Sequence, residues 1–253
     1  MIVEELFKIL TILSQSFYQS PFLLKVSDMN KYEQEFKLSK NIFYDLVTLT
    51  RRHINPTNPH NISKGYTVTN KADGERSGLY VARDRKLIRI AKNNKIIWTG
   101  IIANDDSHIG DFIDGEFIPE KNLFCIFDVY RFRNRDLRQL PLMKNDEDTV
   151  KNPLNSRLGC ARLFVEDIRT QFMMLPSLTP LRIETKLFLA GDGPSMEEAI
   201  RTMLATEFEY EIDGLIFTPK STPVAPSEDR KGKTWLRVYK WKPSTQNSID
   251  FFE

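Results

Sequence analysis

The chain has 253 residues, of which 41% are hydrophobic, and 36 Lys and Arg stand against 34 Asp and Glu for a net charge of +2. This composition supports a substantial core and excludes a globally disordered chain. The balanced charge gives no support for nucleic-acid binding driven by bulk charge. Two cysteines are too few for a disulfide framework, which favours a reduced, intracellular compartment. No apolar run reaches the roughly 18 residues of a transmembrane helix, and the N-terminus opens with acids, so we expect neither a membrane partner nor a signal peptide.

The first part of the chain is predicted to be mostly helical. Apolar residues recur at helical spacing over residues 6–13 and again over 43–50. Residues 55–61 then contain two prolines and three asparagines, which interrupt any helix and mark a boundary. We therefore expect an N-terminal, mostly helical segment at 1–55 and a folded domain at 56–253.

The middle of the chain is dominated by short runs typical of strands. These runs occupy residues 66–69, 78–82, 87–90, 96–101, 111–118 and 123–129. The dipeptide Asn93-Asn94 is predicted as a turn between two of them.

The last third of the chain mixes helices and strands. Apolar spacing predicts a helix over 158–172, and Ser195 with Glu198 predicts a capping box that starts a second helix. The stretch 220–233 is rich in Pro, Ser and charge and is predicted as an exposed loop. Strand-like runs occupy 181–189, 212–218 and 236–241. Antiparallel strands with helices packed outside them give the α+β fold class.

The most informative segment is the hexapeptide Lys71-Ala-Asp-Gly-Glu-Arg76, which lies between two predicted strands. A lysine becomes a useful nucleophile when burial or neighbouring cations free its amine. The guanidinium of Arg76 suits phosphate or ribose oxygens. A charged β-turn with a surface lysine would explain the same six residues, so this motif alone is only suggestive.

Four further motifs follow the hexapeptide in order. They are Asp114-Gly-Glu116, Cys125-Ile-Phe-Asp-Val129, Asp213-Gly-Leu-Ile-Phe217 and Lys240-Trp-Lys-Pro243. Together the five motifs resemble those of the covalent nucleotidyltransferase superfamily, which comprises mRNA capping enzymes and ATP-dependent polynucleotide ligases. The resemblance covers about residues 66–251. It implies antiparallel β-sheets flanked by helices that form a nucleotide cleft.

Three details resemble the RNA guanylyltransferase branch more than the ligases. The fourth motif begins with Asp213, where ligases typically carry Glu. The fifth motif is followed by Asn247-Ser-Ile-Asp-Phe251, similar to the capping pattern. The segment Arg182-Ile-Glu-Thr-Lys186-Leu-Phe188 is similar to one whose lysine contacts guanine. One alternative is the adenylation domain of an ATP-dependent RNA or DNA ligase. The other is a catalytically silent nucleotide- or RNA-binding module, but the presence of Lys71 and of both motif-five lysines disfavours this second alternative.

The resemblance implies a two-step reaction with GTP as substrate. Lys71 attacks the α-phosphorus and expels pyrophosphate, and a 5′-diphosphate RNA then accepts GMP from the lysine to give the GpppN cap. Lys240 and Lys242 alternate along a strand, so both can reach the α-phosphate from one face, with Trp241 directed into the core.

The resemblance also assigns the remaining site residues. Glu116 is expected at the ribose and at a metal ion, and Asp213 is the better metal ligand, for Mg²⁺ or Mn²⁺. Phe127 resembles the ring that stacks on the purine, although a core phenylalanine is the alternative. Lys186 is expected to donate to guanine O6, an acceptor that adenine lacks.

Two departures from the family pattern are visible. Ala72 follows the nucleophile where many capping enzymes have Thr, so one polar base contact is missing. The family usually continues into an OB-fold domain with a sixth, basic motif, which this chain lacks. We therefore expect a fused or associated OB-fold, RNA triphosphatase and cap methyltransferase domains, and a cytoplasmic location in a viral or cytoplasmic genetic element. Four arginines between 131 and 138 are predicted either to guide RNA or to form a solvated loop.

Overall fold

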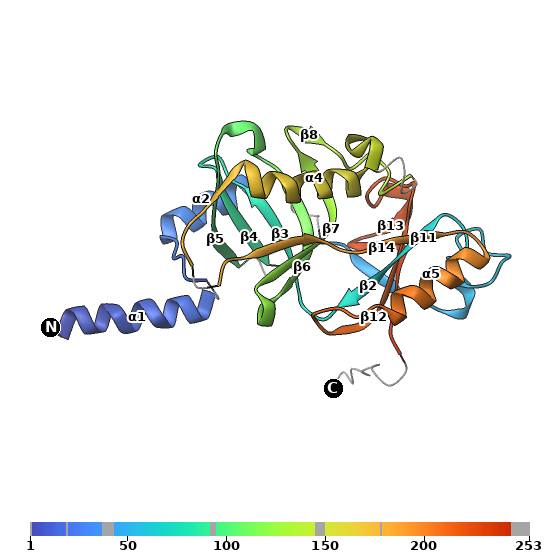
Figure 1. Ribbon diagram of the computed structural model, residues 1–253, viewed down its shortest axis with the longest axis horizontal. Helices are drawn as coiled ribbons and strands as arrows, with labels where there is room; N and C mark the ends of the chain where they lie inside the picture. The colour runs from blue at the N-terminus through green and yellow to red at the C-terminus, as the bar shows by residue number, and fades with distance from the viewer. Residues whose placement is uncertain are drawn as a thin grey trace.

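The computed structural model describes residues 2–18, 20–36, 43–91, 95–144, 150–177 and 179–243. Two β-sheets form the body of the molecule, with helices packed on their outer faces (Figure 1). The α+β fold class predicted from the sequence is confirmed. Among the described helices, none is both long enough and apolar enough to cross a membrane.

The first sheet has six strands, in the order β1-β14-β12-β2-β11 with β13 paired to β14. Their bounds are β1 (Asp45–Thr48), β2 (Tyr66–Ala72), β11 (Leu189–Gly191), β12 (Ile212–Pro219), β13 (Arg230–Lys231) and β14 (Thr234–Trp241). The pairing of β1 with β14 is parallel, and the other described pairings of this sheet are antiparallel.

The second sheet has eight strands, in the order β10-β7-β6-β3-β4-β5-β9 with β8 paired to β7. Their bounds are β3 (Glu75–Val81), β4 (Lys86–Ala91), β5 (Ile96–Ala103), β6 (Phe112–Ile118), β7 (Leu123–Phe132), β8 (Arg135–Asp136), β9 (Phe172–Met174) and β10 (Arg182–Thr185). Here β10 runs parallel to β7. The turn between β2 and β3 carries the chain from one sheet to the other, so the hexapeptide that begins at Lys71 lies at the junction of the two sheets.

Each sheet has its own helix and its own apolar core. Helix α4 (Arg157–Thr170) packs on β7 and β10, with Phe164 and Ile168 buried in the core of the second sheet. Helix α5 (Pro194–Ala205) packs on β2 and β11, with Met196 and Met203 buried against the first sheet. Two further helices, α1 (Ile2–Tyr18) and α2 (Val26–Phe36), precede the sheets, and α1 projects from the body (Figure 1).

The predicted strands between residues 66 and 129 are all confirmed, with ends shifted by a few residues. The helical interpretation of residues 43–50 is wrong, because residues 45–48 form β1. The backbone N–H of Asp45 donates to Lys233 O at 2.8 Å and that of Leu49 donates to Lys240 O at 2.7 Å. Pairing with a strand almost 200 residues away therefore outweighs the local apolar spacing. Strand β1 lies before residue 55 but belongs to the first sheet, so the first sheet includes residues from both sides of the predicted domain boundary. The boundary itself remains a prediction.

Other corrections concern the ends of elements. Helix α4 ends at Thr170, and Phe172 lies in β9 instead of the helix. Helix α5 begins at Pro194 after Gly193, and the hydroxyl of Ser195 bonds to the backbone of Asp192, so the predicted capping box is absent there.

Two predicted segments also differ in the structure. The run 181–189 is divided between β10 and β11, and the predicted exposed loop 220–233 contains β13 and buries Val224 and Ala225. The predicted turn Asn93-Asn94 and the segment 247–251 lie outside the described residues.

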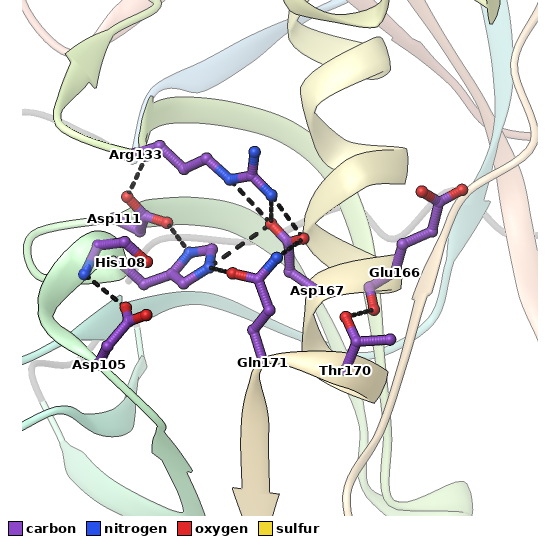
Figure 2. A network of polar contacts seen from close by, with 9 residues as sticks. Asp105, His108, Asp111, Arg133, Glu166, Asp167, Thr170 and Gln171 are labelled. Carbon is purple, nitrogen blue, oxygen red and sulfur yellow. Dashed lines mark hydrogen bonds and ion pairs between the residues drawn. The ribbon is translucent and has the colours of Figure 1, made fainter.

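A buried polar network ties the segment before β6 to α4 (Figure 2). His108 is fully buried, with Nδ1 2.8 Å from Asp111 Oδ2 and Nε2 3.1 Å from Gln171 Oε1. Arg133 donates to both oxygens of Asp167, at 2.7 and 2.9 Å, and its backbone N–H donates to Asp111. Burial acts to lower the pKa of His108, but the two hydrogen bonds and the nearby carboxylates outweigh it and raise this pKa above its ordinary value. Both ring nitrogens face acceptors, which favours the charged imidazolium.

The network predicts a stability that depends on pH. Because the folded-state pKa of His108 is raised, its contribution is fully present below the ordinary value of about 6.5 and is lost as pH rises through the folded-state pKa. We expect the free energy of unfolding to fall more between about pH 6 and about pH 9 in the parent chain than in His108→Gln, which cannot titrate. Urea denaturation at both pH values measures the difference, and equal slopes in the two proteins would contradict the assignment.

Candidate active site

A cavity of about 300 Å³ lies between the two sheets, and most of the predicted site residues line it. The predicted residues on its wall are Lys71, Arg76, Glu116, Phe127, Lys186 and Lys240. The other two, Asp213 and Lys242, adjoin it through direct contact with one another and with Lys71. Strands from both sheets therefore bring together side chains that are up to 171 positions apart in the chain.

The position of Asp213 opposite Lys71 results from an irregularity in strand pairing. Ile212 pairs with Ala72 and Leu215 pairs with Asn70, so two residues of β12 stand opposite one residue of β2. These two residues are Asp213 and Gly214, and the single residue facing them is Lys71. A β-bulge of this kind redirects the side chains of the bulged strand. Here Asp213 Oδ1 accepts a hydrogen bond from Lys71 Nζ at 2.6 Å.

The carboxylate of Asp213 also binds a second lysine. Lys242 Nζ lies 2.6 Å from Asp213 Oδ2, so each carboxylate oxygen has its own ammonium partner. Burial acts to raise the pKa of Asp213, but the hydrogen bonds from Lys242 and Lys71 outweigh it and hold this pKa below its usual value. Lys240, two residues earlier, lines the cavity, and Trp241 packs on the opposite side against the core of the first sheet. The alternation predicted for these three residues is therefore present.

The bulge requires a glycine at position 214. The backbone φ of Gly214 is +146°, a conformation that L side chains rarely adopt, and a Cβ there would lie 1.9 Å from the carbonyl oxygen of Trp241. The close approach of β12 and β14 that brings Asp213 to Lys242 therefore excludes any side chain at 214.

We expect Gly214→Ala to lower the free energy of unfolding by at least about 3 kcal/mol, because backbone strain and a contact with main-chain atoms act together. Gly232→Ala is the matched control: φ is +61° there, but no atom lies within 4 Å of an added Cβ. Its cost should stay near the roughly 1–2 kcal/mol of a left-handed residue, clearly below the first value. Denaturant unfolding compares the two, and equal costs would show that the contact with Trp241 is unimportant.

Arg76 is held by a bidentate ion pair inside the cavity wall. Its Nε and Nη2 donate to the two oxygens of Asp114 at 2.8 and 2.6 Å, and Asp114 is fully buried. Its guanidinium carbon lies 4.4 Å from the centre of the Phe127 ring. The arginine predicted to contact the nucleotide is thus packed against the ring predicted to stack on the purine. Phe127 lines the cavity and also packs against the core cluster that contains Leu142 and Phe188.

Glu116 and Lys186 form a second charged pair of groups on the cavity wall. Burial raises the pKa of Glu116, although the charges of Arg76, Lys186 and Lys71 oppose that shift. Burial lowers the pKa of Lys186 to about 8, with the charge of Glu116 opposing it. The Lys186 ammonium donates to the carbonyl oxygen of Asn70, one residue before Lys71. A buried lysine whose charge is only partly compensated is well placed to bind an acceptor on a ligand.

Comparison with known proteins identifies the family. The family model described as mRNA capping enzyme, catalytic domain, matches residues 45–244, which include every predicted site residue. The chain belongs to this family. The match begins at the first residue of β1, in agreement with the place of that strand in the first sheet.

Three relatives illustrate the similarity to capping enzymes. The probable mRNA-capping enzyme of Acanthamoeba polyphaga mimivirus is 26% identical over 227 residues, covering 76% of this chain and 19% of that protein. An mRNA-capping enzyme of African swine fever virus is 29% identical over 189 residues, covering 74% and 18%. The mRNA-capping enzyme of Caenorhabditis elegans is 26% identical over 221 residues, covering 81% and 32%. The chain therefore spans 18% to 32% of the length of these relatives.

Solved structures show a weaker likeness. The ligase domain of M. tuberculosis LigD aligns with 70% of this chain and 53% of that chain at 11% identity, with a TM-score of 0.41. Mycobacterial DNA ligase D complexed with ATP and MES gives a TM-score of 0.39 at 13% identity, over 70% and 54% of the two chains. These scores are too low to support a conclusion about function.

Several cavity residues of this capping-enzyme domain were not predicted from its motifs. Tyr130 and Asp128 come from β7, Phe43 and Tyr44 directly precede β1, and Trp235 comes from β14. Asp128 belongs to the motif Cys125–Val129 but was given no role there, and Tyr130 directly follows that motif, so the motif could have pointed to both. The others are brought in by the β1–β14 pairing, for which the sequence carries no local signal.

The remaining sequence expectations can be placed as well. Ala72 lies in the cavity wall and packs against Ile118, Leu123 and Cys125, an apolar setting in which it offers no polar contact. In the arginine run, Arg133 is committed to Asp167 and belongs to the buried network near α4. That arginine therefore has a structural role, which the two interpretations of the run did not include.

The donor set can be compared with the needs of a divalent metal ion. Among the residues that the structure describes, no group of three or more His, Cys, Asp and Glu side chains is arranged to hold a metal ion. Mg²⁺ commonly binds one or two carboxylates and takes its other oxygens from water and substrate phosphates. Asp213 and Glu116, which both interact with the charge of Lys71, supply oxygen donors of that kind. The two carboxylates therefore fit a metal that arrives with a nucleotide.

Proposed function

We propose that this chain is the nucleotidyltransferase domain of an mRNA guanylyltransferase, which attaches GMP to Lys71 and then transfers it to the 5′-diphosphate end of RNA. The observation that carries the proposal is the Lys71 amine on the wall of the inter-sheet cavity, 2.6 Å from the Asp213 carboxylate. Cations from three different segments surround that point, as a phosphate ligand requires. Membership of the capping-enzyme family supports the same reaction.

In the first step, the Lys71 ammonium gives up a proton to water, and the neutral amine attacks the α-phosphorus of GTP. The N–P bond forms while the bond from phosphorus to the bridging oxygen of pyrophosphate breaks, and the nitrogen releases a second proton to water. Lysyl-GMP and pyrophosphate are the products. Lys240 in the cavity wall and Lys242 beside it stabilise the negative charge on the transferred phosphoryl group.

In the second step, a terminal phosphate oxygen of a 5′-diphosphate RNA attacks the phosphorus of lysyl-GMP. The N–P bond breaks, the lysine nitrogen regains a proton, and the RNA carries a GpppN cap. Both displacements occur at the same phosphorus, so one set of cations serves both. Asp213 then pairs again with the free lysine, with which it forms a 2.6 Å contact.

Base recognition is assigned to the deeper residues of the cavity. Phe127 provides a ring for stacking on the purine, and Lys186 donates to guanine O6. Arg76 and Glu116 face the ribose. A divalent metal ion, Mg²⁺ or Mn²⁺, would be held by Asp213 and Glu116 and would supply charge neutralisation for the phosphates.

The first test of the proposal is covalent labelling. Incubation with α-labelled GTP and a divalent metal should give an acid-labile label on the protein after denaturing electrophoresis, and γ-labelled GTP should give none. Lys71→Ala should remove the label, because it removes the amine that faces the β12 bulge from the cavity wall, whereas Lys242, the other amine bound to Asp213, is not among the described residues that line the cavity. Lys231→Ala, at an exposed lysine of β13, is the matched control and should label normally.

Two results would overturn this proposal. Equal labelling of Lys71→Ala would exclude Lys71 as the nucleophile. Preferential labelling by ATP would support the adenylation domain of an RNA or DNA ligase. Ala72 bears on this alternative, because its apolar surroundings provide no polar contact to guanine at that position.

The second test concerns Asp213. Asp213→Asn keeps the size of the side chain but removes its charge, so the concentration of Mg²⁺ or Mn²⁺ needed for half-maximal labelling should rise at least about tenfold. Thermal unfolding should change little, because ion pairs of partly exposed lysines contribute on the order of 1 kcal/mol. An unchanged metal requirement would remove Asp213 from the metal site.

The wider setting of the domain is part of the proposal. The matched region makes up 18% to 32% of these relatives, and this greater length supports fused or associated OB-fold, RNA triphosphatase and cap methyltransferase domains as partners. Two of the relatives are viral, which supports action in the cytoplasm as part of a viral or cytoplasmic genetic element. Within the chain, the proposed nucleotidyltransferase unit is 56–253 together with β1, preceded by the helical segment.

A further inference from the structure

Tyr130 takes part in the cavity without belonging to any of the motifs. Its hydroxyl donates to Asp114 Oδ2 at 2.7 Å, and the same oxygen accepts a hydrogen bond from Arg76 Nη2 at 2.6 Å. Tyr130 and Asp114 are 3% and 0% exposed, so water cannot replace either partner. A buried carboxylate of this kind depends on its protein donors.

The contacts form a chain that ends at the base-stacking ring. Asp114 binds two of the nitrogens of Arg76, and because a guanidinium is planar and rigid, this also sets the direction of the third nitrogen. The guanidinium carbon lies 4.4 Å from the centre of the Phe127 ring and 5.9 Å from that of Phe43. At the shorter distance a cation and a ring attract one another.

We propose that Tyr130 is a positioning residue for the nucleotide: its hydroxyl orients Asp114, which holds the Arg76 guanidinium against one face of the Phe127 ring before a nucleotide enters. The guanidinium then lies against one face of the Phe127 ring, and the base stacks on the other face. The ring is already held in place, so it loses less conformational entropy when the nucleotide binds. This inference rests on the proposed function, because it assigns Phe127 and Arg76 to the nucleotide.

Tyr130 also packs in an apolar cluster with Phe112, Val238 and other residues, and a purely structural role in that cluster is the competing explanation. Tyr130→Phe separates the two roles, since it keeps the ring and removes only the hydroxyl. Tyr80→Phe is the matched control, because Tyr80 packs against the same cluster but is not among the described residues that line the cavity.

The test is a double-mutant cycle read by equilibrium binding of GDP, which has the base, ribose and α-phosphate but cannot release pyrophosphate. We expect Tyr130→Phe to weaken GDP binding about tenfold, in the range for loss of a hydrogen bond to a charged group. In an Arg76→Lys background, where the bidentate pair cannot form, the same change should have less than about a twofold effect. Tyr80→Phe should change the affinity by less than about twofold in either background.

A second readout is the split between KM and kcat for lysyl-GMP formation. Tyr130→Phe should raise KM for GTP by a factor similar to its loss of GDP affinity and leave kcat within about twofold, because Lys71 and its cations are untouched. Equal effects of Tyr130→Phe in both backgrounds, or an unchanged GDP affinity, would overturn the inference. Coupled binding without any covalent label would overturn the proposed reaction and leave the positioning role in place, so the two failures are distinguishable.

Discussion

The site depends on the placement of two residues of β12 opposite one residue of β2. Without that bulge, strict alternation would leave Asp213 in register with β2 and would not direct its carboxylate at the Lys71 amine. The bulge also opens one carboxylate oxygen to Lys242, which binds at 2.6 Å from the neighbouring strand. Only glycine can occupy position 214, because the carbonyl of Trp241 lies where a Cβ would be. A single irregularity of pairing thus joins the motifs of β2, β12 and β14 into one charged cluster.

Buried carboxylates with matched donors organise the other side of the cavity. Asp114 is clamped by Arg76 and Tyr130, and the fully buried Arg157, at the start of α4, donates from Nε to Asp128 Oδ1 at 2.7 Å. Without its partner, each of these buried charged groups would be strongly destabilised by the loss of its hydration. Because each depends on a partner from another element, these pairs restrict how β3, β6, β7 and α4 can sit relative to one another. Rigid placement of that kind suits the proposed function, in which the cavity orients a nucleotide before a displacement at phosphorus.

Much of the fold was predictable because its information is local. The strands between residues 66 and 129 have buried, β-branched and aromatic runs bounded by turn residues, and they form where the sequence indicates. Residues 43–50 show the limit of this reasoning. Their apolar spacing suits a helix, yet the backbone of Asp45 bonds to Lys233, just before β14, and that of Leu49 bonds to Lys240 of β14. Partners so distant in the sequence leave no signal in a local window.

Residue types and their spacing in the sequence were enough to predict the family, which the family match confirms, and to predict the groups proposed to take part: a lysine beside a turn, carboxylates on two strands and alternating lysines on a third. Tertiary structure alone decided how they meet. It bound Lys71 to Asp213, packed Arg76 on Phe127, and brought Tyr130 and the β1 segment into the cavity wall. The physical reason is that residue type and spacing report the chemistry of a segment and its own backbone preferences. Contacts between segments are decided by strand pairing, bulges and the need of every buried charge for a partner.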